Sequence, residues 1–206
     1  MERIEKKEEK KEEKQEEKTE KITLKKRFSA KRLALMAVFV ALAFGMSFLE
    51  IPTPFFGANF LKLDFGNVFI VLISFLLGPI EGVIVCVLKE CLRMIGGTVV
   101  GEIANMIMTC SFLLLPSIVY RYKKGIATVV CSLAAACVIA TGAALVVNRF
   151  ITFPLYEAFL GMPAKEAFGV FWGAILIFNL LKTAAISVLT MLLYKRLSNF
   201  LKNKKI

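Results

Sequence analysis

After its first 32 residues, the chain is a series of long apolar runs separated by short polar, proline- or glycine-containing stretches. A bilayer interior offers no water to backbone polar groups, so runs of this length and composition fold as transmembrane helices. With 57% hydrophobic residues in a chain of 206, the sequence predicts an all-α membrane protein. The runs that we expect to form helices are residues 33–50, 66–78, 79–96, 101–120, 125–148 and 168–194.

Basic residues beside the apolar runs predict how the helices are oriented. Lys and Arg near the end of a span stay on the cytoplasmic side of the membrane. Six spans place residues 25–32, residues 121–124 and the C-terminal lysines on that side, whereas five spans would put the C-terminal lysines outside. The turn signal Gly78-Pro79 divides the second run from the third. The sequence therefore predicts a six-transmembrane-helix bundle with both termini cytoplasmic.

This topology also accounts for the formal net charge of +11. Most basic residues belong to the tails and to one cytoplasmic loop, so no basic surface remains for nucleic acid. The absence of histidine and of C-x-x-C spacing argues against metal sites and His-based catalysis. The domains that we expect are a charged, disordered cytoplasmic tail over 1–32, a six-helix transmembrane substrate-binding domain over 33–196 and a basic cytoplasmic tail over 197–206.

A few polar side chains interrupt the apolar runs. A Lys or Arg at the centre of a span costs about 2.5–3.5 kcal/mol on insertion scales, so such residues indicate function. With six spans, most of them fall in the outer half of the membrane, which predicts a polar pocket open to the outside. The set comprises Asp64, Lys89, Arg93, Glu102, Asn105, Asn148, Asn179 and Lys182.

The chemistry of this set suits a flat heterocycle with alternating carbonyl and ring-nitrogen edges. Asparagine amides both donate and accept hydrogen bonds, and Lys182 donates only. The alternative is that Lys182 pairs with a buried carboxylate, Glu90 or Glu102, while the asparagines join helices. Clustering in one leaflet favours the pocket. Aromatic residues that could cover the faces of the heterocycle are Phe55, Phe56, Tyr156, Trp172 and Phe178.

Two long outer connections, residues 50–64 and 149–167, combine aromatic residues with prolines. Such segments act as lids over a pocket. They also act as interfacial anchors in an aromatic belt. The sequence leaves both interpretations open.

The first helix carries a stripe of small residues at three- and four-residue spacing: Ala34, Ala37, Ala41 and Gly45. Small residues allow another helix to approach closely. The stripe therefore predicts either docking of a partner helix or close packing inside the bundle.

Four segments, taken together, resemble the riboflavin-specific substrate-binding (S) components of energy-coupling-factor (ECF) transporters. They are LKLDFGNVFIVLISFLLGPIEGVIVCVLKECLR, VGEIANMIM, VVNRFITFPLY and FNLLK, and the resemblance spans about residues 30–195. It implies a multi-pass protein of the cell membrane that captures riboflavin at the extracellular face. It also implies partners, a transmembrane coupling subunit and two ATPase subunits that deliver the vitamin inward. The absence of a Walker A sequence agrees with that division of labour.

The resemblance also implies roles for particular residues. Asn148 matches a flavin-contacting Asn late in the fifth helix, and Asn179 and Lys182 match an Asn-x-x-Lys in the sixth. Substrate contacts are further expected from Lys89, Glu102 and Asn105, which lie in similar motif regions. The docking surface for the coupling subunit corresponds to Ala34, Ala37 and Ala41.

Other functions stay open at this point. An S component for thiamine, folate, pantothenate or biotin differs only in its ligand, and riboflavin is not distinguished from FMN or roseoflavin. An intramembrane enzyme is disfavoured because such sites use paired carboxylates with His, or Arg/His clusters. An autonomous transporter would show an internal repeat, which we do not find. We expect no enzymatic activity, no metal and no cofactor besides the transported ligand.

Overall fold

The computed structural model describes residues 29–52, 60–96, 99–123, 125–161 and 163–203. Most of the expected N-terminal tail, the aromatic residues Phe55 and Phe56 and the last three residues lie outside the described residues. Contacts divide the chain into two units after Ala37. The cavity and all contacts discussed below belong to the unit that begins at Val38.

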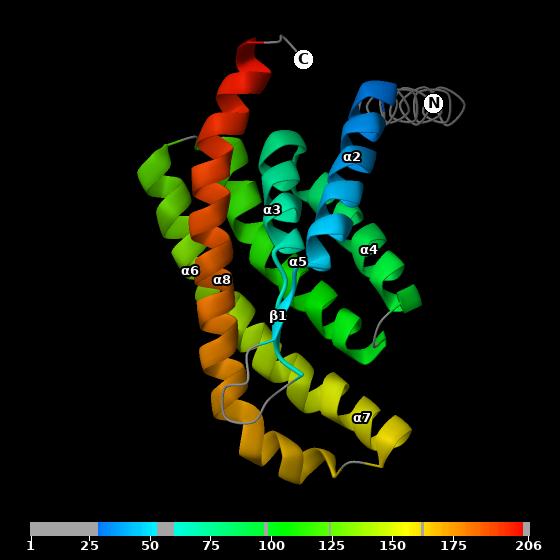
Figure 1. Cartoon of the computed structure of the whole chain (residues 1–206). Coiled ribbons are helices and arrows are strands. Elements are labelled where there is room, and N and C mark those ends of the chain that lie inside the picture. The colour runs from blue at the N-terminus through cyan, green and yellow to red at the C-terminus, as the bar shows by residue number, and fades with distance from the viewer. Residues whose placement is uncertain (1–28, 53–59, 97–98, 124, 162, 204–206) are drawn as a thin grey trace, which may run out of the picture. The chain divides into compact units, whose positions relative to one another are not determined.

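The described chain is helical except for one short pair of strands (Figure 1). The helices agree closely with the predicted runs. They are α2 (Ala30–Ser47), α3 (Gly66–Leu77), α4 (Pro79–Gly96), α5 (Val99–Tyr122), α6 (Ile126–Val147), the π-helix η2 (Asn148–Thr152), α7 (Phe153–Leu160) and α8 (Ala164–Asn203).

The break between α3 and α4 lies at Gly78, as the Gly78-Pro79 signal predicts. Gly78 has φ of 133°, a conformation that residues with a Cβ rarely adopt. Pro79 then begins α4, where its missing N–H would have no helical partner in any case. One apolar stretch thus becomes two helices.

The segment 149–167, which we expected to be a connection, is mostly helical. α6 continues through η2 into α7, so helix extends without interruption from Ile126 to Phe159. Pro154 comes just after the π-helical turn η2, where the helical hydrogen-bond pattern changes and a residue without an N–H is accommodated. The prolines and aromatic residues therefore did not indicate a loop. Figure 1 shows the chain bending between α6 and α7, and π-helical turns are a common site of such bends.

A pair of two-residue strands departs from the all-α prediction. β1 (Ile51–Pro52) pairs with β2 (Lys62–Leu63) in antiparallel fashion, with Ile51 opposite Leu63. The pairing brings Glu50 and Lys62 together, with 2.5 Å between Glu50 Oε1 and Lys62 Nζ. Strands this short have no alternating pattern that a sequence could reveal.

α3 lies in the centre of the packed helices and contacts α4, α5 and α8. Nine of its 12 residues are buried, so this short helix has little surface left for lipid. The contact with α4 is close because Gly82 has no side chain: a Cβ there would lie 2.4 Å from the Cβ of Ser74. Around this centre, α5 packs on α4 and α6, and α6 packs on α8.

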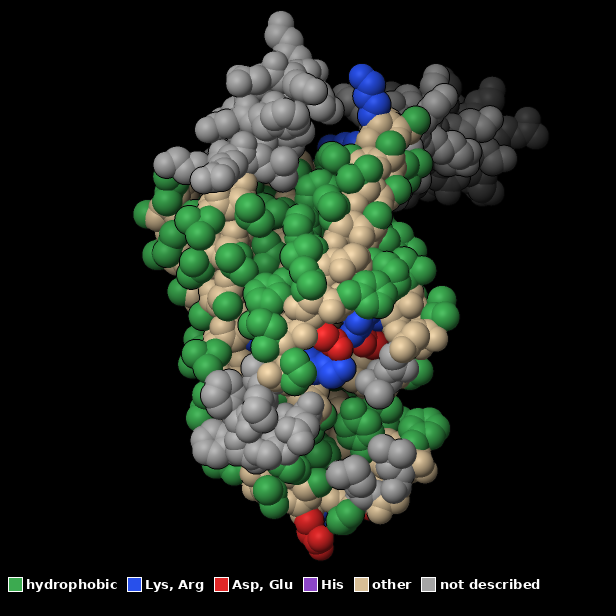
Figure 2. All heavy atoms as spheres, viewed as in Figure 1, with side chains coloured by type: hydrophobic (Ala, Val, Ile, Leu, Met, Phe, Trp, Pro, Cys, Tyr) green, Lys and Arg blue, Asp and Glu red, His purple; other side chains and the backbone are tan. Residues whose placement is uncertain are grey.

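Four helical segments of the described chain are long and apolar enough to cross a bilayer: Ala30–Ser47, Val99–Tyr122, Ile126–Phe159 and Ala164–Tyr194. α3 is apolar but shorter. α4 is less apolar because four charged residues interrupt it. The face drawn in Figure 2 carries mainly hydrophobic side chains, with acidic and basic side chains gathered near its middle and further charged ones at its upper and lower ends.

Candidate functional site

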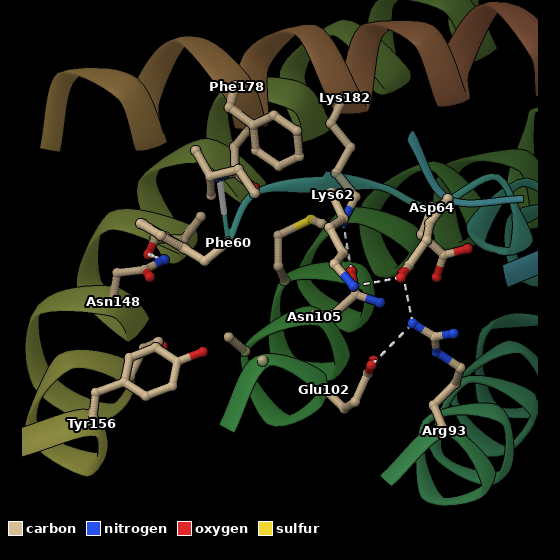
Figure 3. A pocket seen from close by; sticks show the side chains of 18 of the residues that line it. Phe60, Lys62, Asp64, Arg93, Glu102, Asn105, Asn148, Tyr156, Phe178 and Lys182 are labelled. Carbon is tan, nitrogen blue, oxygen red and sulfur yellow. Dashed lines mark hydrogen bonds and ion pairs between the residues drawn. The ribbon is translucent and has the colours of Figure 1, made fainter. Parts of the chain in front are cut away.

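A cavity of about 470 Å³ opens between the ends of several helices and the β1–β2 pair (Figure 3). This volume lies within the range of about 300–1,000 Å³ that is usual for small-molecule sites. The side chains around it are Glu50, Phe60, Leu61, Lys62, Asp64, Arg93, Glu102, Ala104, Asn105, Met108, Ala144, Asn148, Thr152, Tyr156, Phe178, Asn179 and Lys182.

Asn148 and Asn179 reach the cavity from the end of α6 and from α8. Asn148 Nδ2 donates to the carbonyl of Ala144 at 2.8 Å, and Asn179 Nδ2 donates to that of Ile175 at the same distance. A carbonyl oxygen only accepts, so each bond fixes which way the amide points. Each side chain therefore keeps its Oδ1 acceptor and one N–H donor for a ligand.

Lys182 of α8 is 5% exposed and points toward α5. Its Nζ donates to Asn105 Oδ1 at 2.7 Å. An ammonium group has three protons, so at least one remains for a ligand in the cavity. The alternative interpretation paired Lys182 with the carboxylate of Glu90 or Glu102. In the structure its hydrogen-bond partner is an amide oxygen instead.

Asn105 belongs to a largely buried set of polar groups. Asn105 Nδ2 donates to Glu90 Oε1 at 2.6 Å, and Lys89 Nζ donates to the same oxygen at 2.8 Å. Lys89 also pairs with Asp64, the residue that follows β2. Asn67 of α3 completes the set by donating to Asn105 Oδ1 at 3.1 Å. We call Asp64, Asn67, Lys89, Glu90, Asn105 and Lys182 the buried network.

A second group of charges lies at the more exposed side of the cavity. Arg93 Nη2 is 2.7 Å from Glu50 Oε2 and 3.2 Å from Glu102 Oε1, and Lys62 binds the other oxygen of Glu50. We call Glu50, Lys62, Arg93 and Glu102 the rim ion pairs. They connect the β1–β2 pair to α4 and α5.

Glu50 lies between α2 and β1, outside the helices. Burial alone would raise the pKa of its carboxyl group. The hydrogen bonds and charges of Lys62 and Arg93 outweigh that effect, so the pKa lies below its ordinary value of 4.5. Glu50 is therefore ionised at neutral pH.

Apolar and aromatic surfaces complete the cavity. Phe60, Tyr156 and Phe178 line it, whereas Trp172 does not and is 52% exposed. Phe60 packs edge-on against Phe153 and Phe171, which fixes the orientation of its ring. Of the aromatic residues expected around the ligand, Tyr156 and Phe178 thus reach the cavity.

Most residues singled out from the sequence come together here. Asn105, Glu102, Asn148, Asn179 and Lys182 all line the cavity. Lys89 is not among the lining residues, because it is buried between Asp64 and Glu90. The cavity also includes Glu50, Phe60 and Lys62, which the sequence analysis did not assign to it, together with Asp64 and Arg93 from the expected polar set.

The formal charges around the cavity are equal in number. The lining residues include three cations, Lys62, Arg93 and Lys182, and three anions, Glu50, Asp64 and Glu102. Behind them, Lys89 and Glu90 add one charge of each sign. A charged ligand would therefore upset an even balance of formal charge among the described residues that line the cavity.

The small-residue stripe of α2 lies on the opposite side of that helix from its packed face. Phe39 and Ala43 are buried, and a Cβ at Gly66 of α3 would lie 2.2 Å from the carbonyl oxygen of Ala43. Ala41 and Gly45 are exposed, and a Cβ at Gly45 would have no neighbour within 4 Å. Within the described residues of the unit that begins at Val38, Ala41 and Gly45 are thus open rather than used for internal packing.

The sequence model of the family "ECF transporter, substrate-specific component" matches residues 31–194. The chain belongs to this family. A solved structure described as "Structure and mechanism of the S component of a bacterial ECF transporter" is 34% identical, with a TM-score of 0.74, and the match covers 84% of this chain and 98% of that one. The chain is accordingly a multi-pass membrane protein with the S-component fold.

Two characterised relatives carry more specific names. Riboflavin transporter RibU of Staphylococcus aureus (strain TCH60) is 34% identical over 176 residues, which cover 84% of this chain and 93% of that protein. Riboflavin transporter FmnP of Bacillus subtilis (strain 168) is 25% identical over 183 residues, covering 85% and 96%. The chain thus spans nearly the full length of both relatives.

Proposed function

We propose that this protein is the riboflavin-binding S subunit of an ECF transporter and holds the vitamin in the cavity described above. The observation that carries the proposal is the equal number of positive and negative side chains around a cavity lined by fixed amides. Membership of the S-component family and similarity to two riboflavin transporters support it.

The balance of charges favours riboflavin over the other vitamins considered. Riboflavin is uncharged at neutral pH, whereas thiamine is a cation and biotin, pantothenate and folate carry carboxylates. A charged ligand would add one uncompensated charge to a site whose formal charges already sum to zero, and an uncompensated buried charge is strongly unfavourable. FMN is disfavoured for the same reason, because its phosphate is anionic. Roseoflavin is uncharged and is expected to bind as riboflavin does.

The arrangement of donors and acceptors suits the pyrimidine edge of a flavin. That edge presents a carbonyl, an N–H and a second carbonyl in a row. It requires a donor, an acceptor and a donor from the protein. Lys182 can supply a donor, and Asn148 and Asn179 each supply an acceptor and a donor in fixed orientations. Phe60 and Phe178 are placed to contact the apolar ring system.

Residues of α4 and α5 have further roles in the proposed site. We assign Asn105 and Glu102 to direct contacts at the side of α5, since both line the cavity. Lys89 does not line it, so we assign it to the support of Asp64 and Glu90 instead. The rim ion pairs lie between the cavity and the exposed side.

The transport cycle that we infer follows from the family. Six spans put residues 1–32 and 197–206 in the cytoplasm and the cavity toward the outside, with 33–196 as the substrate-binding domain. A transmembrane coupling subunit docks on Ala34, Ala37 and Ala41, and two ATPase subunits supply the energy. The chain itself contributes ligand binding and no catalysis.

A competition titration tests the proposal. Riboflavin fluorescence is quenched when the flavin stacks against aromatic residues, so purified protein in detergent should quench it with a stoichiometry of one. Excess roseoflavin should reverse the quenching, and thiamine, biotin, pantothenate and folate should not. Reversal by a charged vitamin, or absence of quenching, would contradict the assignment.

A further inference from the structure

We propose that Glu90, which does not line the cavity, is a positioning residue for the ligand: it fixes the Asn105 amide, and through it the Lys182 ammonium group. The inference rests on the proposed function, because its readout is riboflavin affinity. It starts from the hydrogen bonds of a single side chain, Asn105.

Asn105 uses both ends of its amide. Its Oδ1 accepts from Lys182 Nζ at 2.7 Å and from Asn67 Nδ2 at 3.1 Å, which occupies both lone pairs. Its Nδ2 donates to Glu90 Oε1 at 2.6 Å. The amide therefore stands between a group that only donates, Lys182, and an oxygen that accepts, Glu90.

Glu90 determines which way this amide faces. If the amide turned over, its NH₂ group would face the Lys182 ammonium, and two donors would meet. Its oxygen would then face the oxygen of Glu90. Buried polar groups with mismatched partners lose their full solvation without compensation. As long as Glu90 Oε1 accepts from Asn105, the oxygen of the amide must face Lys182.

Glu90 is in turn immobilised. Its side chain is fully buried, and Oε1 also accepts from Lys89 Nζ at 2.8 Å. Lys89 is held from the other side by Asp64. Asp64, after β2, thus holds Lys89 of α4 in place, and Lys89 holds Glu90 Oε1. That oxygen orients the Asn105 amide of α5, which in turn binds Lys182 of α8. None of this requires Glu90 to touch the ligand.

Replacing Glu90 tests whether the acceptor matters. Glu90→Leu removes it and should weaken riboflavin binding by about tenfold or more, whereas Glu90→Gln keeps an amide oxygen and should stay within about threefold of the parent. Glu81→Leu is the matched control: Glu81 is also buried on α4, about 13 Å along the helix, and does not line the cavity. Its riboflavin affinity should be unchanged. Equal affinities of Glu90→Leu and the parent would overturn the inference.

A polarity swap provides a second test without loss of side-chain volume. Asn105→Asp places a carboxylate against Glu90 and should weaken binding by about tenfold or more. Adding Glu90→Gln lets Gln donate to Asp while Asp accepts from Lys182, and it restores the parent's net charge. The double variant should bind riboflavin about threefold or more tighter than Asn105→Asp alone. A double variant no better than Asn105→Asp alone would contradict the proposed orientation.

A double-mutant cycle separates positioning from general stabilisation. In a Lys182→Met background the group that Glu90 positions is gone, so Glu90→Leu should have little further effect on affinity. Equal effects of Glu90→Leu in both backgrounds would show that it acts independently of Lys182. If the parent itself failed to bind riboflavin, the proposed function would fail first. Normal binding by the parent with unaffected Glu90 variants would overturn this inference alone.

Discussion

Asn148 and Asn179 lie on different helices, yet both make the same hydrogen bond: each donates an amide proton at 2.8 Å to the backbone carbonyl four residues earlier. The two bonds fix both amides before any ligand arrives. A site prepared in this way loses little side-chain entropy on binding. The two residues are therefore well suited to recognise the polar edge of a rigid ring.

Truncation of either asparagine should weaken riboflavin binding. Asn148→Ala and Asn179→Ala each leave a buried polar edge of the ligand without its partner, which corresponds to about 1–3 kcal/mol. Fluorescence-quenching titrations of the purified variants measure the change. Thr190→Val, a buried change on α8 outside the cavity lining, is the control and should keep the parental affinity. Parental affinity in both alanine variants would remove these residues from the site.

The selection against phosphorylated flavin should depend on Glu102. Arg93 Nη2 lies 3.2 Å from Glu102 Oε1, so Glu102→Gln leaves the guanidinium with less negative charge around it. The cavity then carries one excess positive charge, which favours an anionic ligand. We expect the ratio of FMN affinity to riboflavin affinity to rise severalfold, measured by paired titrations. Glu157→Gln, a change of the same charge at an exposed position of α7, should leave the ratio unaltered. A constant or falling ratio in Glu102→Gln would argue against the role of charge balance.

The helices could be read from the sequence because each apolar run ends at a charge, a glycine or a proline. The split at Gly78-Pro79 was found this way. The segment 149–167 was misjudged because a proline usually ends or interrupts a helix, whereas Pro154 follows the π-helical turn η2 within a continuous helix. The continuity of α6, η2 and α7 emerges only from the fold.

Residues of the cavity could be predicted where polar side chains share one face of a single apolar helix. Asn179 and Lys182 share a face of α8 at a spacing of three, and their position in an apolar run marks them. Glu50 and Lys62 could not be placed, since 12 residues separate them and only the β1–β2 pairing joins them. Lys89 carried the same signal as Lys182, and only the packing of α4 against the segment after β2 shows that it faces away from the cavity.

Acid should weaken the rim ion pairs in a defined pH window. The pKa of Glu50 is lowered in the folded protein, so its ion pairs add stability that is present above its unfolded-state pKa and lost as pH falls through the folded value. The difference in melting temperature between the parent and Glu50→Gln should be constant from pH 7 to about pH 5 and shrink at lower pH. Thermal unfolding followed by the fluorescence of the single Trp172 measures it. A difference that grows on acidification would contradict this role of Glu50.

The stripe on α2 should serve transport and not ligand binding. Ala37 is exposed, and a tryptophan there would prevent close approach of another helix. We expect Ala37→Trp to bind riboflavin normally in detergent but to abolish riboflavin uptake in cells that carry the coupling subunit and the ATPases. Val138→Trp places the same side chain at a 68% exposed position of α6 and should transport normally. Uptake by Ala37→Trp at the parental rate would show that docking occurs elsewhere.

The most direct measurement is an experimental structure of the protein with riboflavin bound. The account predicts the flavin in the cavity between α5, α6 and α8, its pyrimidine edge within about 3 Å of the side-chain polar atoms of Asn148, Asn179 and Lys182. It also predicts that each charged residue of the rim ion pairs keeps an oppositely charged partner when riboflavin is bound. A flavin bound outside this cavity, or one whose polar edge faces away from these three side chains, would contradict it.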